Sequence, residues 1–138
     1  MLTIFPSLLW LGLAAPFLLR VTLGLVFLHA SYLKLKKEKN ERAELFQEIG
    51  LKPGIVYSQT LGYFEIILGL SLIAGYLTQI SALISALLFG IIAFIKIFKK
   101  PSTMEKVGES GEYYLILTVI SISLLFSGAG FLAFDLPL

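Results

Sequence analysis

The fold is decided by the stretch GIVYSQTLGYFEIILGLSLIAGYLTQISALISALLFGIIAFIKIF (54–98), which is apolar almost throughout. Residues 54–77 carry a single charge, Glu65, and residues 78–98 carry one Lys near their end. About 20 apolar residues cross the hydrocarbon core of a bilayer as a helix, and the backbone there must satisfy its hydrogen bonds internally. The stretch therefore predicts two transmembrane helices, over 54–77 and 78–98, joined by a short turn.

Two more apolar segments, residues 14–33 and 113–134, flank this pair. The chain has 138 residues, of which 57% are hydrophobic and 14% charged, and its mean hydropathy is +0.90. Soluble domains carry about 25% charged residues, and so small a chain has too little interior to hide this much apolar surface. We predict a single all-α domain over residues 1–138, an integral membrane bundle of four transmembrane helices.

The placement of the basic residues predicts the orientation in the membrane. Ten of the eleven Lys and Arg residues lie in or beside the expected loops 34–53 and 99–112. With four spans both loops lie on one side, and basic loops stay in the cytoplasm. We expect a multi-pass protein of the plasma or inner membrane with both termini outside the cytoplasm. Residues 1–13, apolar but too short to span, are expected to lie in the outer interface.

The first loop has a pattern of its own. Residues 34–50, KLKKEKNERAELFQEIG, interleave Lys and Glu at helical spacing. Such pairs stabilise a solvent-exposed helix, so the loop is expected either to extend the first span or to form a short surface helix. Because its acids nearly balance its bases, a nucleic-acid partner is not expected.

The composition also limits the chemistry. The chain has no Cys and one His, which excludes disulfides, thiolate metal sites, iron–sulfur clusters and a bis-histidine haem. It contains no nucleophile–base motif, phosphate-binding loop or metal-ligand pattern. We therefore expect no metal site and no covalently bound cofactor, and the sequence leaves open whether the protein is an enzyme.

One face of the helix over 54–77 is small and polar around Glu65. At helical spacing this face holds Ser58, Gly62, Glu65, Gly69, Leu72 and Tyr76. Small residues let helices approach closely in lipid, so we interpret the face as a packing surface. The alternative is that it lines a cavity beside the carboxyl group.

Charges inside the bilayer are the main candidates for a functional site, because each costs at least ~2.5–3.5 kcal/mol to insert. At ~1.5 Å per residue the expected depths of Arg20 and Glu65 differ by about 5 Å, and we predict that these residues pair. Asp135, at the outer end of the last helix, is the rival partner for Arg20. The pair is either a structural salt bridge or a polar site that binds a ligand head group or relays protons. Lys34 is expected to snorkel to the inner interface.

His29 lies in the inner half of the first span, nine residues after Arg20. At 100° per residue these two residues point to opposite faces of the helix. We expect His29 to face the inner end of the last helix, where three residues are candidates: Glu112, Tyr113 and Tyr114. It is either a hydrogen-bonded core residue or, with an ordinary pKa of about 6.5, a proton carrier.

Three segments resemble the DoxX family of membrane proteins. LLRVTLGLVFLHASYLKL (18–35) resembles the first helix of that family, with its Arg, the following Gly and the His before a Lys. FEIILGLSLIAGYLT (64–78) resembles its second helix, and GEYYLILTVISISLLFSGAGFLAFDLPL (111–138) resembles its last. The three occur in the family's order along the chain.

The resemblance implies a compact four-helix membrane bundle. Carried over residue by residue, the family's polar positions fall on Arg20, His29, Lys34, Glu65, Glu112 and Asp135. It does not imply one activity, since the family includes the DoxD-type subunits of thiosulfate:quinone oxidoreductase, proteins that assist maturation of redox enzymes, and partners in oxidative-stress complexes.

Three functions follow as hypotheses. The first is a quinone-interacting or accessory subunit of a membrane redox system, which would receive electrons from a soluble or membrane-bound partner protein. The second is a non-catalytic scaffold or assembly factor that docks through loop 34–53. The third is a small-solute or proton transporter with Glu65 as carrier, which is weakened because no inverted repeat is evident. The sequence leaves the oligomeric state open.

Overall fold

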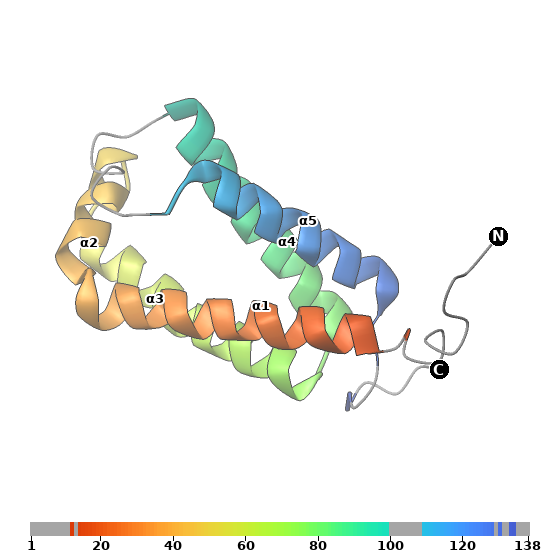
Figure 1. Cartoon of the computed structure of the whole chain (residues 1–138). Coiled ribbons are helices and arrows are strands. Elements are labelled where there is room, and N and C mark those ends of the chain that lie inside the picture. Colours follow the sequence, from red (N-terminus) through yellow and green to blue (C-terminus); the bar gives the residue numbers. More distant parts are fainter. Residues whose placement is uncertain (1–11, 13, 100–108, 129, 131–132, 135–138) are drawn as a thin grey trace.

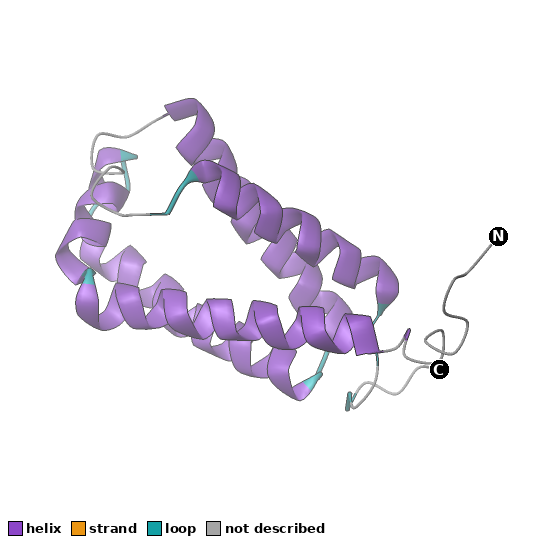
Figure 2. Ribbon diagram, in the orientation of Figure 1, coloured by secondary structure: helices purple, strands orange, loops and turns teal. Residues whose placement is uncertain are grey.

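Every element of the described chain is a helix. The computed structural model describes residues 12, 14–99, 109–128, 130 and 133–134. In chain order its elements are α1 Ala14–Tyr32, the π-helical segment η2 Leu33–Lys37, α2 Lys39–Glu48, α3 Gly54–Ala74, α4 Thr78–Phe94, the π-helical segment η3 Ile95–Lys99, and α5 Gly111–Ser127 (Figures 1 and 2). The predicted all-α class is confirmed for these residues.

Within the described part of the chain, three helical stretches are long and apolar enough to cross a membrane. They are Ala14–Lys37, Gly54–Ala74 and Thr78–Lys99, with 24, 21 and 22 residues. They correspond to the first three predicted spans, and the two that continue through π-helical segments end later than predicted.

The fourth predicted span, 113–134, differs from the helix that forms there. α5 is apolar but has 17 residues and ends at Ser127, because Gly128 follows with a positive φ of 77°. The expected interfacial segment 1–13, apart from Gly12, and residues 100–108 of the second loop lie outside the described residues.

The long helices form two antiparallel pairs. α1 packs along α3 and α4 packs along α5, whereas α3 and α4 contact each other over a shorter length. The start of α1, the α3–α4 turn and the end of α5 lie at one end of the bundle, and α2 lies at the other (Figure 1). We call these the turn end and the α2 end.

Loop 34–53 combines the two alternatives expected for it, because η2 extends the first helix and α2 follows as a separate short helix. Its residues Arg42 and Ala43 are buried, while Leu45 and Phe46 are partly buried. α2 lies against the start of α3, where a methyl group on Gly54 would come within 2.0 Å of the Ala43 carbonyl oxygen. The basic loop is therefore folded onto the bundle and covers its end.

Glycines allow α1 and α3 to approach closely. A methyl group on Gly24 would lie 2.8 Å from the Gly69 carbonyl oxygen, and one on Gly69 would lie 2.9 Å from the Gly24 carbonyl oxygen. Such contact between backbones is the usual reason for small residues at helix interfaces in lipid.

The small polar face predicted on the second span is the buried face of α3 from Ser58 to Leu72. Tyr76 is the exception and is 60% exposed. α3 ends at Ala74, and Gly75 takes a left-handed conformation with φ 71°, so Tyr76 no longer follows the helical spacing.

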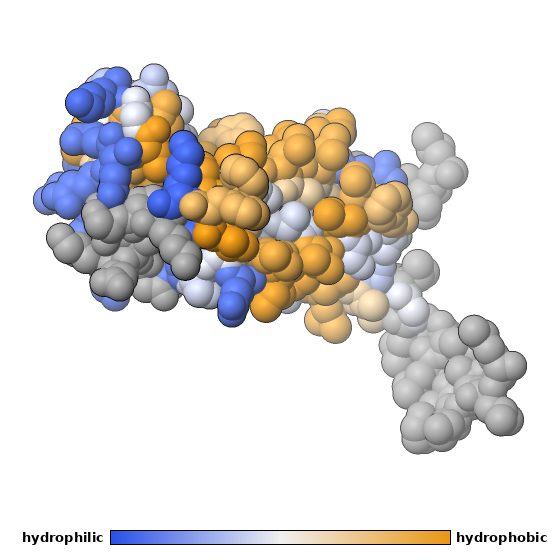
Figure 3. All heavy atoms as spheres, turned by 90° about the horizontal axis from the view of Figure 1, so that it is seen from above, coloured by the Kyte–Doolittle hydropathy of each residue, from blue (hydrophilic) through white to orange (hydrophobic). Residues whose placement is uncertain are grey.

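Aromatic rings meet within the largely aliphatic core between the two helix pairs. The rings of Phe27 and Phe89 stack with centroids 4.6 Å apart, and Tyr114 lies 6.1 Å from Phe89. The face seen in Figure 3 is hydrophobic along the middle of the molecule, and hydrophilic residues gather at the α2 end. This distribution fits a bundle whose outer face contacts lipid.

Candidate functional site

The buried charge pair at the α2 end joins Lys34 to Glu65. The Nζ of Lys34 donates a hydrogen bond to Oε1 of Glu65, and the side chains are only 5% and 1% exposed. The predicted Arg20–Glu65 pair is therefore wrong, and so is the prediction that Lys34 snorkels to the interface. α1 continues helically to Lys37, which carries Lys34 into the bundle opposite Glu65.

Arg20 lies instead at the turn end, where α1 begins beside the end of α3. It is fully buried, with its guanidinium 5.3 Å from the ring centroid of Phe17. A methyl group on Gly75 would lie 2.5 Å from its Nη1. Gly75 is ten residues after Glu65, about 15 Å along the helix, so Arg20 and Glu65 belong to different ends. Asp135, its rival partner in our prediction, lies outside the described residues.

Glu109 joins three elements at the α2 end. Its carboxylate lies 3.4 Å from Nη2 of Arg42 in α2 and accepts a hydrogen bond from the Tyr114 hydroxyl in α5. Arg42 also pairs with Glu38 at 2.9 Å. The carbonyl oxygen of Glu109 accepts a 2.5 Å hydrogen bond from Lys96 in η3.

These contacts set the charge state of Glu109. Burial alone would raise the pKa of its carboxyl group, but the hydrogen bond from Tyr114 and the charges of Arg42 and Lys96 hold that pKa below its ordinary value. For Arg42, burial would lower the pKa, but Glu109, Tyr114 and Glu38 together outweigh burial and raise that pKa. Glu109 and Arg42 are thus both charged around neutral pH.

Lys96 contacts no carboxylate among the described residues. Its Nζ lies 4.8 Å from the centroid of the Tyr114 ring and donates to the Glu109 carbonyl. The residue is only 8% exposed. The three ion pairs within the described part of the chain belong to Lys34 and Arg42.

Both buried lysines come from π-helical segments, Lys34 from η2 and Lys96 from η3. π-helical turns are rare and occur often at functional sites. Each of these segments ends a spanning helix at the α2 end, so the two lysines lie at similar depth.

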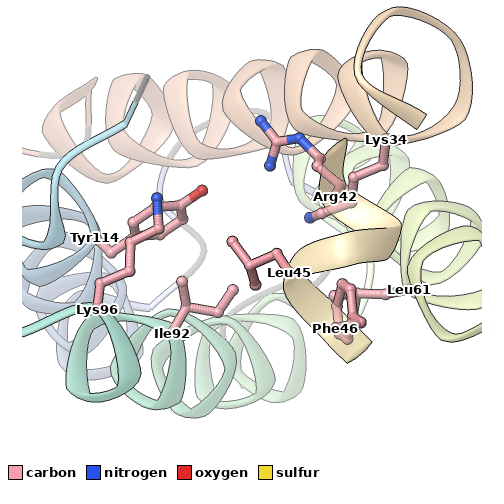
Figure 4. A pocket seen from close by; sticks show the side chains of 8 residues that line it. All are labelled: Lys34, Arg42, Leu45, Phe46, Leu61, Ile92, Lys96 and Tyr114. Carbon is pink, nitrogen blue, oxygen red and sulfur yellow. The ribbon is translucent and has the colours of Figure 1, made fainter. Parts of the chain in front are cut away.

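Two adjoining cavities lie between these residues. The smaller has a volume of about 50 Å³ and its charged or polar lining residues are Lys34, Arg42, Lys96 and Tyr114. Figure 4 shows Lys34 and Arg42 on one side of this space and Lys96 and Tyr114 on the other, with Leu45 between them. A space of this size holds a few water molecules or a small head group.

The larger cavity has a volume of about 230 Å³ and lies between α2, α3 and α4. Apart from Lys96 its lining is aliphatic or aromatic: Leu45, Phe46, Ile49, Leu51, Leu61, Leu88, Ile91, Ile92 and Ile95. The two cavities share five lining residues, Leu45, Phe46, Leu61, Ile92 and Lys96. Together they form an apolar groove with a polar end.

The other predicted site residues are not gathered at one site. His29 is exposed on α1, so its interpretation as a core residue facing the last helix is wrong. Glu112 is exposed at the start of α5. Tyr113 is 38% exposed, and its ring meets that of Tyr114 edge-on at 5.5 Å.

The site residues that sequence reasoning missed are Arg42, Lys96 and Glu109, because each belongs to a charged stretch that looks solvated. The sequence indicates Tyr114 only as one of three residues that His29 could face. The described residues contain no group of three or more His, Asp or Glu side chains that would hold a metal ion.

A family model described as DoxX matches residues 15–97, more than half of the 138 residues. The chain belongs to the DoxX family. Family membership and the apolar helices indicate a multi-pass membrane protein. No curated protein and no solved structure matches the chain. In this DoxX protein Lys34, Arg42, Glu65 and Lys96 all fall within the matched segment, and α5 with Tyr114 follows it.

Proposed function

We propose that this DoxX protein is a quinone-interacting accessory subunit of a membrane redox system. The observation that carries the proposal is the apolar groove of about 230 Å³ that ends at the buried Lys96. A quinone has the matching shape, with an apolar tail and a head whose carbonyl oxygens accept hydrogen bonds. Ligand sites are typically apolar cavities with a few convergent polar groups.

In this proposal each part of the site has one task. The groove between α3 and α4 receives the tail from the bilayer, and Lys96 donates a hydrogen bond to a head-group carbonyl. The Lys34–Glu65 pair fixes α1 against α3, so its role is structural. Since the chain has no Cys and one His, the electrons are exchanged with a partner protein that docks at the α2 end.

We also propose four spans, with α5 as the fourth. Its 17 residues reach about 25 Å at 1.5 Å per residue, within the range of short transmembrane helices. The basic residues then place α2 and loops 34–53 and 99–112 in the cytoplasm, and both termini outside. A reporter fused after Leu138 that is active only in the cytoplasm would overturn this orientation.

The test of the function is quinone content after purification in mild detergent. Leu61 lines both cavities, and Leu61→Trp fills the groove. Leu70→Trp is the matched control, because Leu70 lies on the same helix, is 55% exposed and lines neither cavity. We expect quinone in the wild type and in Leu70→Trp, and a several-fold loss in Leu61→Trp. Equal quinone in all three, or none in the wild type, contradicts the proposal and leaves the scaffold hypothesis.

A further inference from the structure

Lys96 differs from the other buried cations at the α2 end. Lys34 and Arg42 are each paired with a carboxylate, while Lys96 contacts a carbonyl oxygen and an aromatic ring. An ammonium group has three donors and no acceptor, and only one hydrogen bond of Lys96 is made to the described residues. Part of its donor capacity is therefore left for a ligand.

Lys96 lies where the two cavities adjoin. It is the charged residue common to the small polar cavity and the large apolar one. The carboxylates of Glu65 and Glu109 line neither cavity, and the Tyr114 hydroxyl is already directed to Glu109. The polar end of the groove is thus lined by donors, and no carboxylate among the described residues lines it to act as an acceptor.

We propose that the site at Lys96 selects ligands by head-group chemistry, and this inference rests on the proposed function. Head groups that are anionic or accept hydrogen bonds without donating any are bound more tightly than head groups that carry a cation or hydroxyl donors. A carboxylate amphiphile is favoured over an ammonium amphiphile of the same tail. For the same reason the oxidised quinone is favoured over its quinol. The two hydroxyl groups of the quinol are hydrogen-bond donors, and they would face the donors of the protein.

The experiment is displacement of a fluorescent fatty-acid anion from the purified full chain in nanodiscs of zwitterionic lipid. The competitors are dodecanoate and dodecyltrimethylammonium, compared by their bound concentrations in the same nanodiscs. A hydrogen bond to a charged group contributes about 1.5–3 kcal/mol, so we expect about a tenfold or larger preference for dodecanoate. Equal displacement by the two amphiphiles overturns the inference.

Three variants assign the preference to Lys96. Lys96→Met should abolish it and Lys96→Arg should keep it. Lys99→Met is the matched control, since Lys99 is in the same π-helical segment, exposed, and lines neither cavity. A preference that persists in Lys96→Met, with thermal unfolding showing a folded protein, contradicts the assignment. The wild-type preference tests the inference even if a variant fails to fold.

A short-chain quinone and its quinol, titrated anaerobically, separate this inference from the proposed function. Tighter binding of the quinone, lost in Lys96→Met, supports both. A preference for dodecanoate without any binding of quinone retains the head-group selectivity and rejects quinone as the ligand. Binding of quinone and quinol with equal affinity rejects the selectivity and retains the quinone.

Discussion

The segments η2 and η3 are alike in local structure and different in what their lysines contact. Each is a π-helical end of a long helix, and each carries one buried lysine at the α2 end. Lys34 is neutralised by Glu65, whereas Lys96 lies beside a carbonyl and a ring. Burial of a charge therefore does not by itself indicate function, because the nature of the charge's partner matters as well.

Removing the partner of Lys34 should have the largest effect. Glu65→Leu leaves a buried ammonium without its carboxylate, and such changes destabilise by about 3–5 kcal/mol. We expect a large fall in the thermal unfolding temperature in detergent. The double variant Lys34→Met/Glu65→Leu should recover most of it, because the apolar side chains need no charge partner. A double variant as unstable as Glu65→Leu would show that the loss does not come from an unpaired buried ammonium.

The two helix pairs that carry these lysines should also respond differently to a methyl group. In Gly24→Ala the added methyl group lies 2.5 Å from Cγ1 of Ile73 and 2.8 Å from the Gly69 carbonyl oxygen. Overpacking of this kind destabilises a fold by about 1–3 kcal/mol. Gly90→Ala, between α4 and α5, meets Thr118 Cγ2 at 3.7 Å and should change stability by less than about 0.5 kcal/mol. Thermal unfolding of both variants tests this prediction. Equal effects would show that α1 and α3 are packed no more closely than α4 and α5.

Removing the charge of Lys96 should have a smaller effect on stability. Lys96→Met loses one hydrogen bond to a carbonyl and no carboxylate partner, so we expect a loss of about 1 kcal/mol. Its quinone content should nevertheless fall several-fold relative to Lys99→Met. A fall in stability as large as that of Glu65→Leu would make Lys96 a structural residue like Lys34.

The smallest effect concerns Glu109, which connects the two regions. Because its pKa is lowered in the folded protein, the ionised carboxylate stabilises the fold above the unfolded pKa of about 4.3, and this contribution disappears as pH falls through the folded pKa. The wild type should exceed Glu109→Gln in stability by at most about 1 kcal/mol near neutral pH. The difference should shrink as pH falls to about 3, in thermal unfolding measured against pH. A difference that is independent of pH would show that the charge of Glu109 contributes nothing.

Much of the fold could be predicted because its signals are local. Apolar runs of about 20 residues, the Lys–Glu spacing in α2 and the small face of α3 each arise within one segment. The end of α5 was missed because the apolar run continues past Gly128, where the backbone turns.

The charge partners could not be predicted in the same way. Which cation reaches Glu65 depends on how far α1 continues and where α2 folds back, and neither is encoded in the spacing of Arg20 and Glu65. Lys96 and Glu109 gain their significance only from the packing of η3, α2 and α5 around them.

We propose that a ligand lies in the groove between α2, α3 and α4 with its head at Lys96. A quinone that carries a photoactivatable diazirine at the end of its tail can locate this ligand, when its adducts are mapped by mass spectrometry. We predict adducts on groove residues such as Leu88, Ile91 and Ile49, reduced in Lys96→Met. Adducts spread over exposed residues outside the groove, such as Leu70 and Leu83, in proportion to their exposure would contradict the claim.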